Sequence, residues 1–93
     1  DPPAFGHGPN GEKWKLEEQI NEMILDTLNL LDKENHFYIL NTYSLGFSAL
    51  IIENLLTDNL KKAGLKNVQP EITEIYISSA TLQKLPLGVC ARF

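Results

Sequence analysis

The chain has 93 residues, 43% of them hydrophobic and 22% charged, which is the composition of one small folded domain. A net charge of −4 excludes an overall electrostatic attraction to nucleic acid, so such a contact must come from a local patch or from another segment. One cysteine excludes an internal disulfide framework, and with two histidines beside it no metal site is expected. No apolar run approaches the roughly 20 residues that span a bilayer, so we expect a cytoplasmic protein without membrane contact.

The first six residues, Asp1-Pro2-Pro3-Ala4-Phe5-Gly6, predict a conformationally restricted loop. Each proline fixes its own φ at about −65° and keeps the residue before it extended. A carboxylate and proline carbonyls held in this way can accept hydrogen bonds from an amine or amide of a flat ligand, while Phe5 stacks on its face. The alternative is an extended surface turn.

A flexible loop is expected over residues 6–11, where three glycines, a proline and an asparagine gather. His7 lies in this loop, either as a general base or substrate contact or as a solvated residue. A helix follows from about Lys13 to Asp32, because apolar side chains recur at three- and four-residue steps. Trp14 is expected to pack under the glycine-rich loop, with base stacking as the alternative. The predicted core stripe of the helix is Leu16, Ile20, Met23, Ile24, Thr27, Leu28 and Leu31.

A short apolar run, Phe37 to Leu40, is typical of a strand buried on both faces. It enters a polar and aromatic loop, Asn41 to Phe47, and in open α/β sheets ligands bind at this edge. Ser48 is a plausible N-cap for a second helix that runs to about Lys62. Gly64 supplies the C-terminal stop. The predicted core positions of this helix are Leu50, Ile51, Leu55, Leu56 and Leu60.

Two strands are expected at the end of the chain, Glu71 to Ser78 and Leu85 to Phe93. The short connection between them implies antiparallel pairing, since parallel pairing needs a crossover of about a dozen residues. Cys90 falls on the face opposite Val89, where a packing role is expected rather than a nucleophilic one. The order helix, strand, helix, strand, strand predicts an α/β fold with a partly parallel sheet.

Two stretches resemble a known enzyme family: Asp1 to Glu18 (DPPAFGHGPNGEKWKLEE) and Leu40 to Leu56 (LNTYSLGFSALIIENLL). With the order of elements, they resemble the C-terminal half of a Rossmann-like class I S-adenosylmethionine-dependent methyltransferase, and more narrowly the bacterial enzymes that methylate large-subunit ribosomal RNA. The resemblance covers nearly the whole chain. It implies an active-site loop at residues 1–12 and an α/β half-domain at residues 13–93, the cofactor-binding N-terminal half being absent.

The resemblance also implies roles for single residues. In that family the Asp-Pro-Pro-Phe-type loop lines the place where the methyl group of the cofactor meets its target. The expected catalytic residues are Asp1, Pro2, Pro3 and Phe5, with Asp1 and Pro2 also contacting S-adenosylmethionine. Substrate contacts are expected from His7, Asn41, Tyr43 and Ser44. The glycine-rich loop and the acidic residue that hold most of the cofactor have no counterpart in the chain.

The resemblance further implies an RNA nucleobase as methyl acceptor, and a partner that completes the fold, either the missing N-terminal half or a second copy of the chain. Two other functions stay open. A non-catalytic α/β interaction module could bind a partner through an exposed sheet edge or through Lys61, Lys62 and Lys66, although lysines in a last helical turn also complement the helix dipole. A small unrelated enzyme could use His7 and Asp1 as an acid and base pair.

Overall fold

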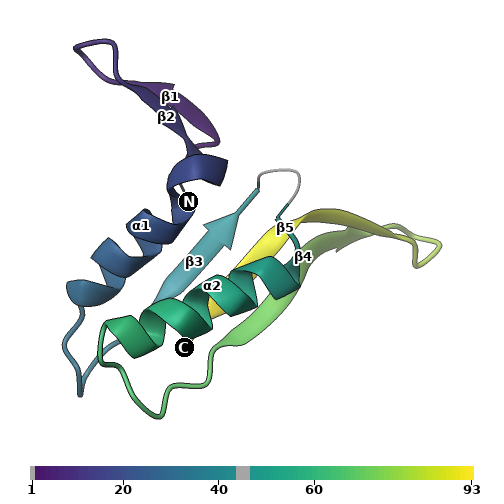
Figure 1. Cartoon of the computed structure of the whole chain (residues 1–93). Coiled ribbons are helices and arrows are strands. Elements are labelled where there is room, and N and C mark those ends of the chain that lie inside the picture. Colours follow the sequence, from purple (N-terminus) through teal and green to yellow (C-terminus); the bar gives the residue numbers. More distant parts are fainter. Residues whose placement is uncertain (1, 44–46) are drawn as a thin grey trace.

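The computed structural model describes residues 2–43 and 47–93, so Asp1 and Ser44, two of the predicted site residues, lie outside the described residues. The described residues form two helices and five strands (Figure 1). The helices are α1 (Leu16–Asn29) and α2 (Ala49–Lys62). The strands are β1 (Phe5–His7), β2 (Lys13–Lys15), β3 (Ile39–Thr42), β4 (Glu71–Ser78) and β5 (Lys84–Arg92).

The main sheet has the strand order β3-β5-β4, with β5 antiparallel to both neighbours. Strands β3 and β4 are therefore parallel to each other across β5, and α2 connects them. The terminal pair is antiparallel as predicted, and the α/β fold class is confirmed. The expectation of a partly parallel sheet is wrong for residues 2–43 and 47–93, because each hydrogen-bonded pair among them is antiparallel. One edge of β3 pairs with no other described strand.

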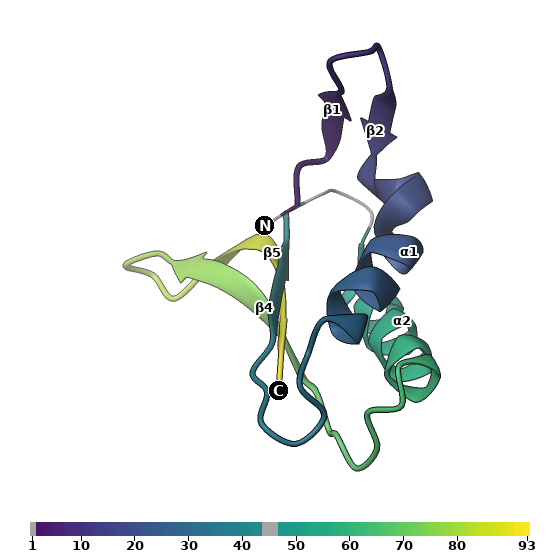
Figure 2. The same cartoon turned by 90° about the vertical axis from the view of Figure 1, so that its left-hand side faces the viewer.

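Both helices cover the same face of this sheet, and the β4–β5 hairpin extends away from them (Figure 2). The core lies between: Leu40, Val89 and Ala91 of the sheet are buried with the helical stripe of Leu16, Ile20, Ile24 and Leu28. The prediction that the first apolar strand is buried on both faces is wrong. Ile39 stays 49% exposed, because no described element covers the second face of the sheet.

The ends of α2 follow the prediction in detail. The Ser48 hydroxyl accepts a hydrogen bond from the Ile51 amide at 3.3 Å, which is an N-cap. At the other end, the Leu65 amide donates to the Leu60 carbonyl at 3.0 Å and the Gly64 amide to the Lys61 carbonyl at 3.2 Å. Gly64 has φ 76°, so these bonds form a Schellman motif in which glycine avoids the cost of a side chain in the left-handed region.

The predicted core face of α2 is partly wrong. Leu50 and Ile51 are exposed, whereas Ile52 is buried. Asn59 is also buried, because its Nδ2 donates to Asn21 Oδ1 on α1 and to the Leu55 carbonyl, each at 2.8 Å. Asn59 therefore belongs to the core face of α2, although a pattern of apolar residues could not predict a polar residue there.

The glycine-rich segment is an ordered hairpin and not the flexible loop that its composition predicted. Strands β1 and β2 are antiparallel, with Gly6 opposite Trp14. The turn closes by a hydrogen bond from the Gly8 amide to the Glu12 carbonyl at 2.7 Å, and Gly11 adopts φ 83°. The expected helix start at Lys13 is therefore wrong by three residues, because residues 13–15 pair with β1 before the helix begins.

Candidate functional site

The segment before β1, residues 2–4, is called the proline loop below. Two hydrogen bonds connect it to the start of α1. The indole Nε1–H of Trp14 donates to the Pro3 carbonyl at 2.7 Å, and the amide of Leu16 donates to the Ala4 carbonyl at 3.0 Å. The second bond satisfies one of the amides that a helix leaves free at its N-terminus, where Lys15 makes no side-chain cap. Because Leu16 is 1% exposed, the loop is anchored to a residue of the hydrophobic core.

These bonds show which backbone carbonyls of the proline loop remain free to accept a hydrogen bond from a ligand. The Pro3 carbonyl was expected to face a ligand, but it accepts the Trp14 indole within the chain. No described residue donates to the Pro2 carbonyl, so this oxygen is the one left for a ligand. Trp14 lies against Gly6, as expected from the sequence, with its Cβ 3.6 Å from the position of an added Gly6 Cβ. No sequence pattern indicated the bond to Pro3.

The β1–β2 hairpin has two different faces. Trp14 and Gly6 form one, and Trp14 lines a shallow hollow beside Gln19 and Met23 of α1. On the other face Phe5 stands opposite Lys15 and His7 opposite Lys13, and all four are exposed. Phe5 is 72% exposed, which is unusual for a phenylalanine and leaves its ring free to stack.

The second group of predicted site residues lies where β3 ends. Asn41 is half-buried and Tyr43 is 52% exposed. The Asn41 Oδ1 and the Thr42 Oγ1 are buried and have no hydrogen-bond partner among the described residues. Buried polar atoms are seldom left unpaired, so these two atoms need a partner outside the described residues. Thr42, which is 1% exposed, was missed because a threonine in a short strand gives no functional signal in the sequence.

A glycine lets β3 end close to its neighbour. A Cβ on Gly88 of β5 would collide with the Thr42 carbonyl oxygen and lie 3.1 Å from the Tyr43 ring. Only glycine allows this approach of two backbones. The close contact holds Asn41 and Tyr43 in place at the end of the strand.

Both views place the segment that leads into β1 beside the C-terminal end of β3 (Figures 1 and 2). The structure therefore brings the segment before β1 to the same edge of the sheet as the end of β3, whereas Phe5 lies in the β1–β2 hairpin. No hydrogen bond joins the two groups among the described residues.

Cys90 lies on the uncovered face of the sheet, in register with Asn41 of β3 and Thr73 of β4. It is a free, half-buried thiol, and Val89 beside it is buried on the helix-covered face, as the alternation predicted. The packing role expected for Cys90 has no described layer to pack against.

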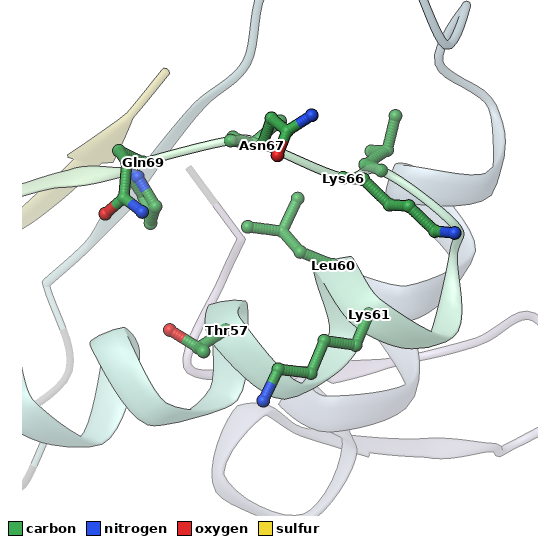
Figure 3. Close-up of a pocket in the computed structure, with 9 residues that line it drawn as sticks. Thr57, Leu60, Lys61, Lys66, Asn67 and Gln69 are labelled. Atoms are coloured by element: carbon green, nitrogen blue, oxygen red, sulfur yellow. The ribbon is translucent and has the colours of Figure 1, made fainter.

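The lysines at the end of α2 border a groove of about 490 Å³ between the helix and the loop before β4. Lys61 and Lys66 line it with Thr57, Asn67 and Gln69 over an apolar floor that includes Leu60. Figure 3 shows the two lysine side chains extending in opposite directions along the rim. Since the two ammonium groups do not converge, the groove is not a preformed anion site.

Among residues 2–43 and 47–93, no helix is long and apolar enough to cross a membrane. The same residues contain no group of three or more His, Cys, Asp or Glu side chains that could hold a metal ion.

Comparison with known proteins gives one clear structural likeness. No protein-family model matches the chain, and no curated protein matches it. The fold is similar to the crystal structure of the S-adenosylmethionine-dependent methyltransferase from Agrobacterium tumefaciens, with a TM-score of 0.81 over 100% of this chain at 23% identity. The chain spans 31% of the length of that protein. It therefore shares the α/β fold of a part of that protein.

Proposed function

We propose that the chain is the C-terminal half of a cytoplasmic S-adenosylmethionine-dependent methyltransferase that methylates a nucleobase in RNA, with large-subunit ribosomal RNA as the first substrate to test. The observation that carries the proposal is the methyltransferase fold over the whole chain. The segment of residues 2–4, beside the C-terminal end of β3 where open α/β sheets bind ligands, agrees with it.

The residues of this half fit the acceptor side of the reaction. S-adenosylmethionine supplies an electrophilic methyl group on a sulfonium, and catalysis then consists mainly of alignment. The Asp1 carboxylate and the Pro2 carbonyl accept hydrogen bonds from the amine of the target base, and Phe5 stacks on a base of the RNA. Asp1 and Pro2 also border the cofactor. His7, Asn41, Tyr43 and Ser44 contact the substrate.

The rest of the cofactor site belongs to a partner, because the chain has no glycine-rich strand-to-helix turn. The structure has room for that partner: β3 offers an edge that no described strand occupies, and one face of the sheet carries no described layer. Unpaired edges and bare apolar faces are unfavourable in an isolated domain. The partner is the missing N-terminal half or, failing that, a second copy of the chain.

Methyl transfer tests the proposal directly. The full-length protein is incubated with tritium-labelled S-adenosylmethionine and unmodified large-subunit ribosomal RNA, and label in the RNA is counted. We expect incorporation by the wild type and a loss of about 100-fold for Asp1→Ala, the size of effect caused by a misplaced reactive group. No label in RNA from the folded wild type would remove the RNA substrate from the proposal.

A cysteine variant then identifies the kind of acceptor atom. Methylation of a base carbon needs a cysteine nucleophile, and in this half only Cys90 is present. Cys90→Ala should leave the rate unchanged if the acceptor is a nitrogen, as we propose. A complete loss, with a covalent RNA adduct in the wild type, would assign a carbon acceptor.

A second function, a non-catalytic interaction module, is favoured by the same uncovered sheet face, where Ile39 is 49% exposed. In that case the isolated chain would be a stable monomer that does not respond to the cofactor. Sedimentation of the chain with and without S-adenosylmethionine separates the two functions.

A further inference from the structure

The outer face of the β1–β2 hairpin combines basic side chains with an exposed aromatic ring. Two lysines and a histidine surround an exposed phenylalanine: Lys15 stands opposite Phe5 and Lys13 opposite His7. Side chains directly opposite on one face of an antiparallel pair have their Cβ atoms about 5 Å apart, so the four side chains form one continuous surface. We call it the hairpin face, residues 5, 7, 13 and 15.

The hairpin face points away from the protein. Trp14 and Gly6, which alternate with it, occupy the opposite side, and Trp14 is bound to the Pro3 carbonyl and lies beside α1. Both views show the hairpin projecting beyond the helices and the sheet (Figures 1 and 2). The exposed Phe5 and lysines therefore serve no purpose in the core of the described residues.

The local charge differs from that of the whole chain. The hairpin from residue 5 to residue 15 carries two lysines against one glutamate, a formal charge of +1, whereas the chain carries −4. The Glu12 carboxylate accepts a hydrogen bond from the Asn10 amide at 2.9 Å, within the turn of the hairpin. Glu18 approaches Lys15 at 3.9 Å, but both side chains are exposed and such a pair holds a lysine only weakly.

We propose that the hairpin face is the RNA-binding surface of the protein, with Lys13 and Lys15 on the phosphates and Phe5 stacked on an unpaired base. The inference rests on the proposed function, because it takes RNA as the substrate. Aromatic side chains within a basic surface are the usual means of holding single-stranded nucleic acid without reading its sequence. Trp14, which alternates with these residues, donates a hydrogen bond to the Pro3 carbonyl, so RNA bound on the hairpin face lies next to the proline loop.

Binding of a fluorescent single-stranded RNA oligonucleotide to the full-length protein, followed by anisotropy over a range of salt concentrations, tests the inference. Each phosphate contact adds about 0.7 to the slope of log K against log salt for single strands. Lys13→Gln with Lys15→Gln should lower the slope by about 1.4 and weaken binding by about tenfold near 0.15 M salt. Phe5→Leu should weaken binding and leave the slope unchanged, since stacking releases no counterions.

The chain offers a matched control, Lys61→Gln with Lys62→Gln, which removes the same charge at the far end of α2. We expect the control to bind like the wild type. Equal losses in the two double variants would show a general charge effect and overturn the inference, as would an unchanged slope in the hairpin variant. A protein that binds RNA through this face but transfers no methyl group would refute the proposed function and leave the inference standing. Methyl transfer by the wild type, together with unchanged RNA affinity in the hairpin variant, would overturn the inference and leave the proposed function standing.

Discussion

The contact between β3 and β5 at Gly88 gives the sharpest structural prediction. In Gly88→Ala the new Cβ would collide with the Thr42 carbonyl oxygen and lie 3.2 Å from the Thr42 carbonyl carbon. The Tyr43 ring, 3.1 Å from the same point, is 52% exposed and can turn away. The Thr42 carbonyl cannot, because it belongs to backbone that pairs with Val89. Relief therefore requires the end of β3 to move away from β5.

The cost of that movement can be estimated. Extra atoms in a well-packed site cost about 1–3 kcal/mol when backbone must shift. With a urea m-value of about 1–2 kcal/mol/M, a loss of about 2 kcal/mol lowers the midpoint of unfolding by about 1–2 M. Because Asn41 and Tyr43 are carried by the displaced segment, methyl transfer should fall further than the lost stability explains.

Urea unfolding followed by far-ultraviolet circular dichroism checks the estimate. The control is Gly6→Ala, whose Cβ would meet Trp14 at 3.6 and 3.9 Å, ordinary contact distances. We expect the control to change the free energy of unfolding by no more than about 0.5 kcal/mol. If Gly88→Ala unfolds at the same urea concentration as this control, the two strands do not approach as closely as described and the reasoning is wrong.

Two further predictions concern the packing of the helices. Asn59→Ala should lower the free energy of unfolding by about 1–2 kcal/mol, because Asn59 bonds Asn21 and the Leu55 carbonyl in the core; a double-mutant cycle with Asn21→Ala shows whether the two side chains act together. Tyr38→Phe should cost about 1 kcal/mol through the lost 2.8 Å bond to Thr27 Oγ1. Burial raises the pKa of Tyr38 above 10.0 in the folded protein, so its contribution is intact below pH 10.0 and is lost as the pH rises through the folded value. The stability gap between wild type and Tyr38→Phe should therefore narrow above pH 10.0, and a gap that widens there in urea titrations would contradict this account.

The sequence predicted the elements that depend on local chemistry. The N-cap at Ser48, the left-handed Gly64 and the strand from Glu71 to Ser78 are all found as expected. Each rests on one residue or on a simple alternation, which no tertiary contact overrides. The antiparallel terminal pair followed from its short connection for the same reason.

The parts that could not be predicted depend on contacts between distant segments. Glycines at residues 6, 8 and 11 are typical of a loop, and only pairing with residues 13–15 turns the segment into a hairpin. Asn59 is buried because Asn21, 38 residues earlier, accepts its hydrogen bond. Ile39 is exposed because no described residue covers the second face of the sheet. The apolar pattern of the strand could not indicate that this layer is absent among the described residues.

The candidate site shows the same division. The proline loop and the end of β3 were predicted as site segments from their residue types and their places beside strands and helices, and their roles stay predictions. The hydrogen bond between Trp14 and Pro3, which leaves the Pro2 carbonyl as the free acceptor, could be identified only from the three-dimensional structure. The hairpin face was hidden because Lys13 and Lys15 were expected on a helix, where residues two apart do not share a face.

Cofactor binding is the most direct test of the central claim, that these residues are one half of a methyltransferase. Ligand at a hundredfold its Kd stabilises a protein by about 2.7 kcal/mol, which raises the Tm of a protein of more than 150 residues by about 5–10 °C. We predict such a rise for the full-length protein with S-adenosylmethionine, and none for the 93-residue chain alone, because the chain lacks the glycine-rich loop. A full-length protein whose Tm does not move at saturating S-adenosylmethionine would contradict the account.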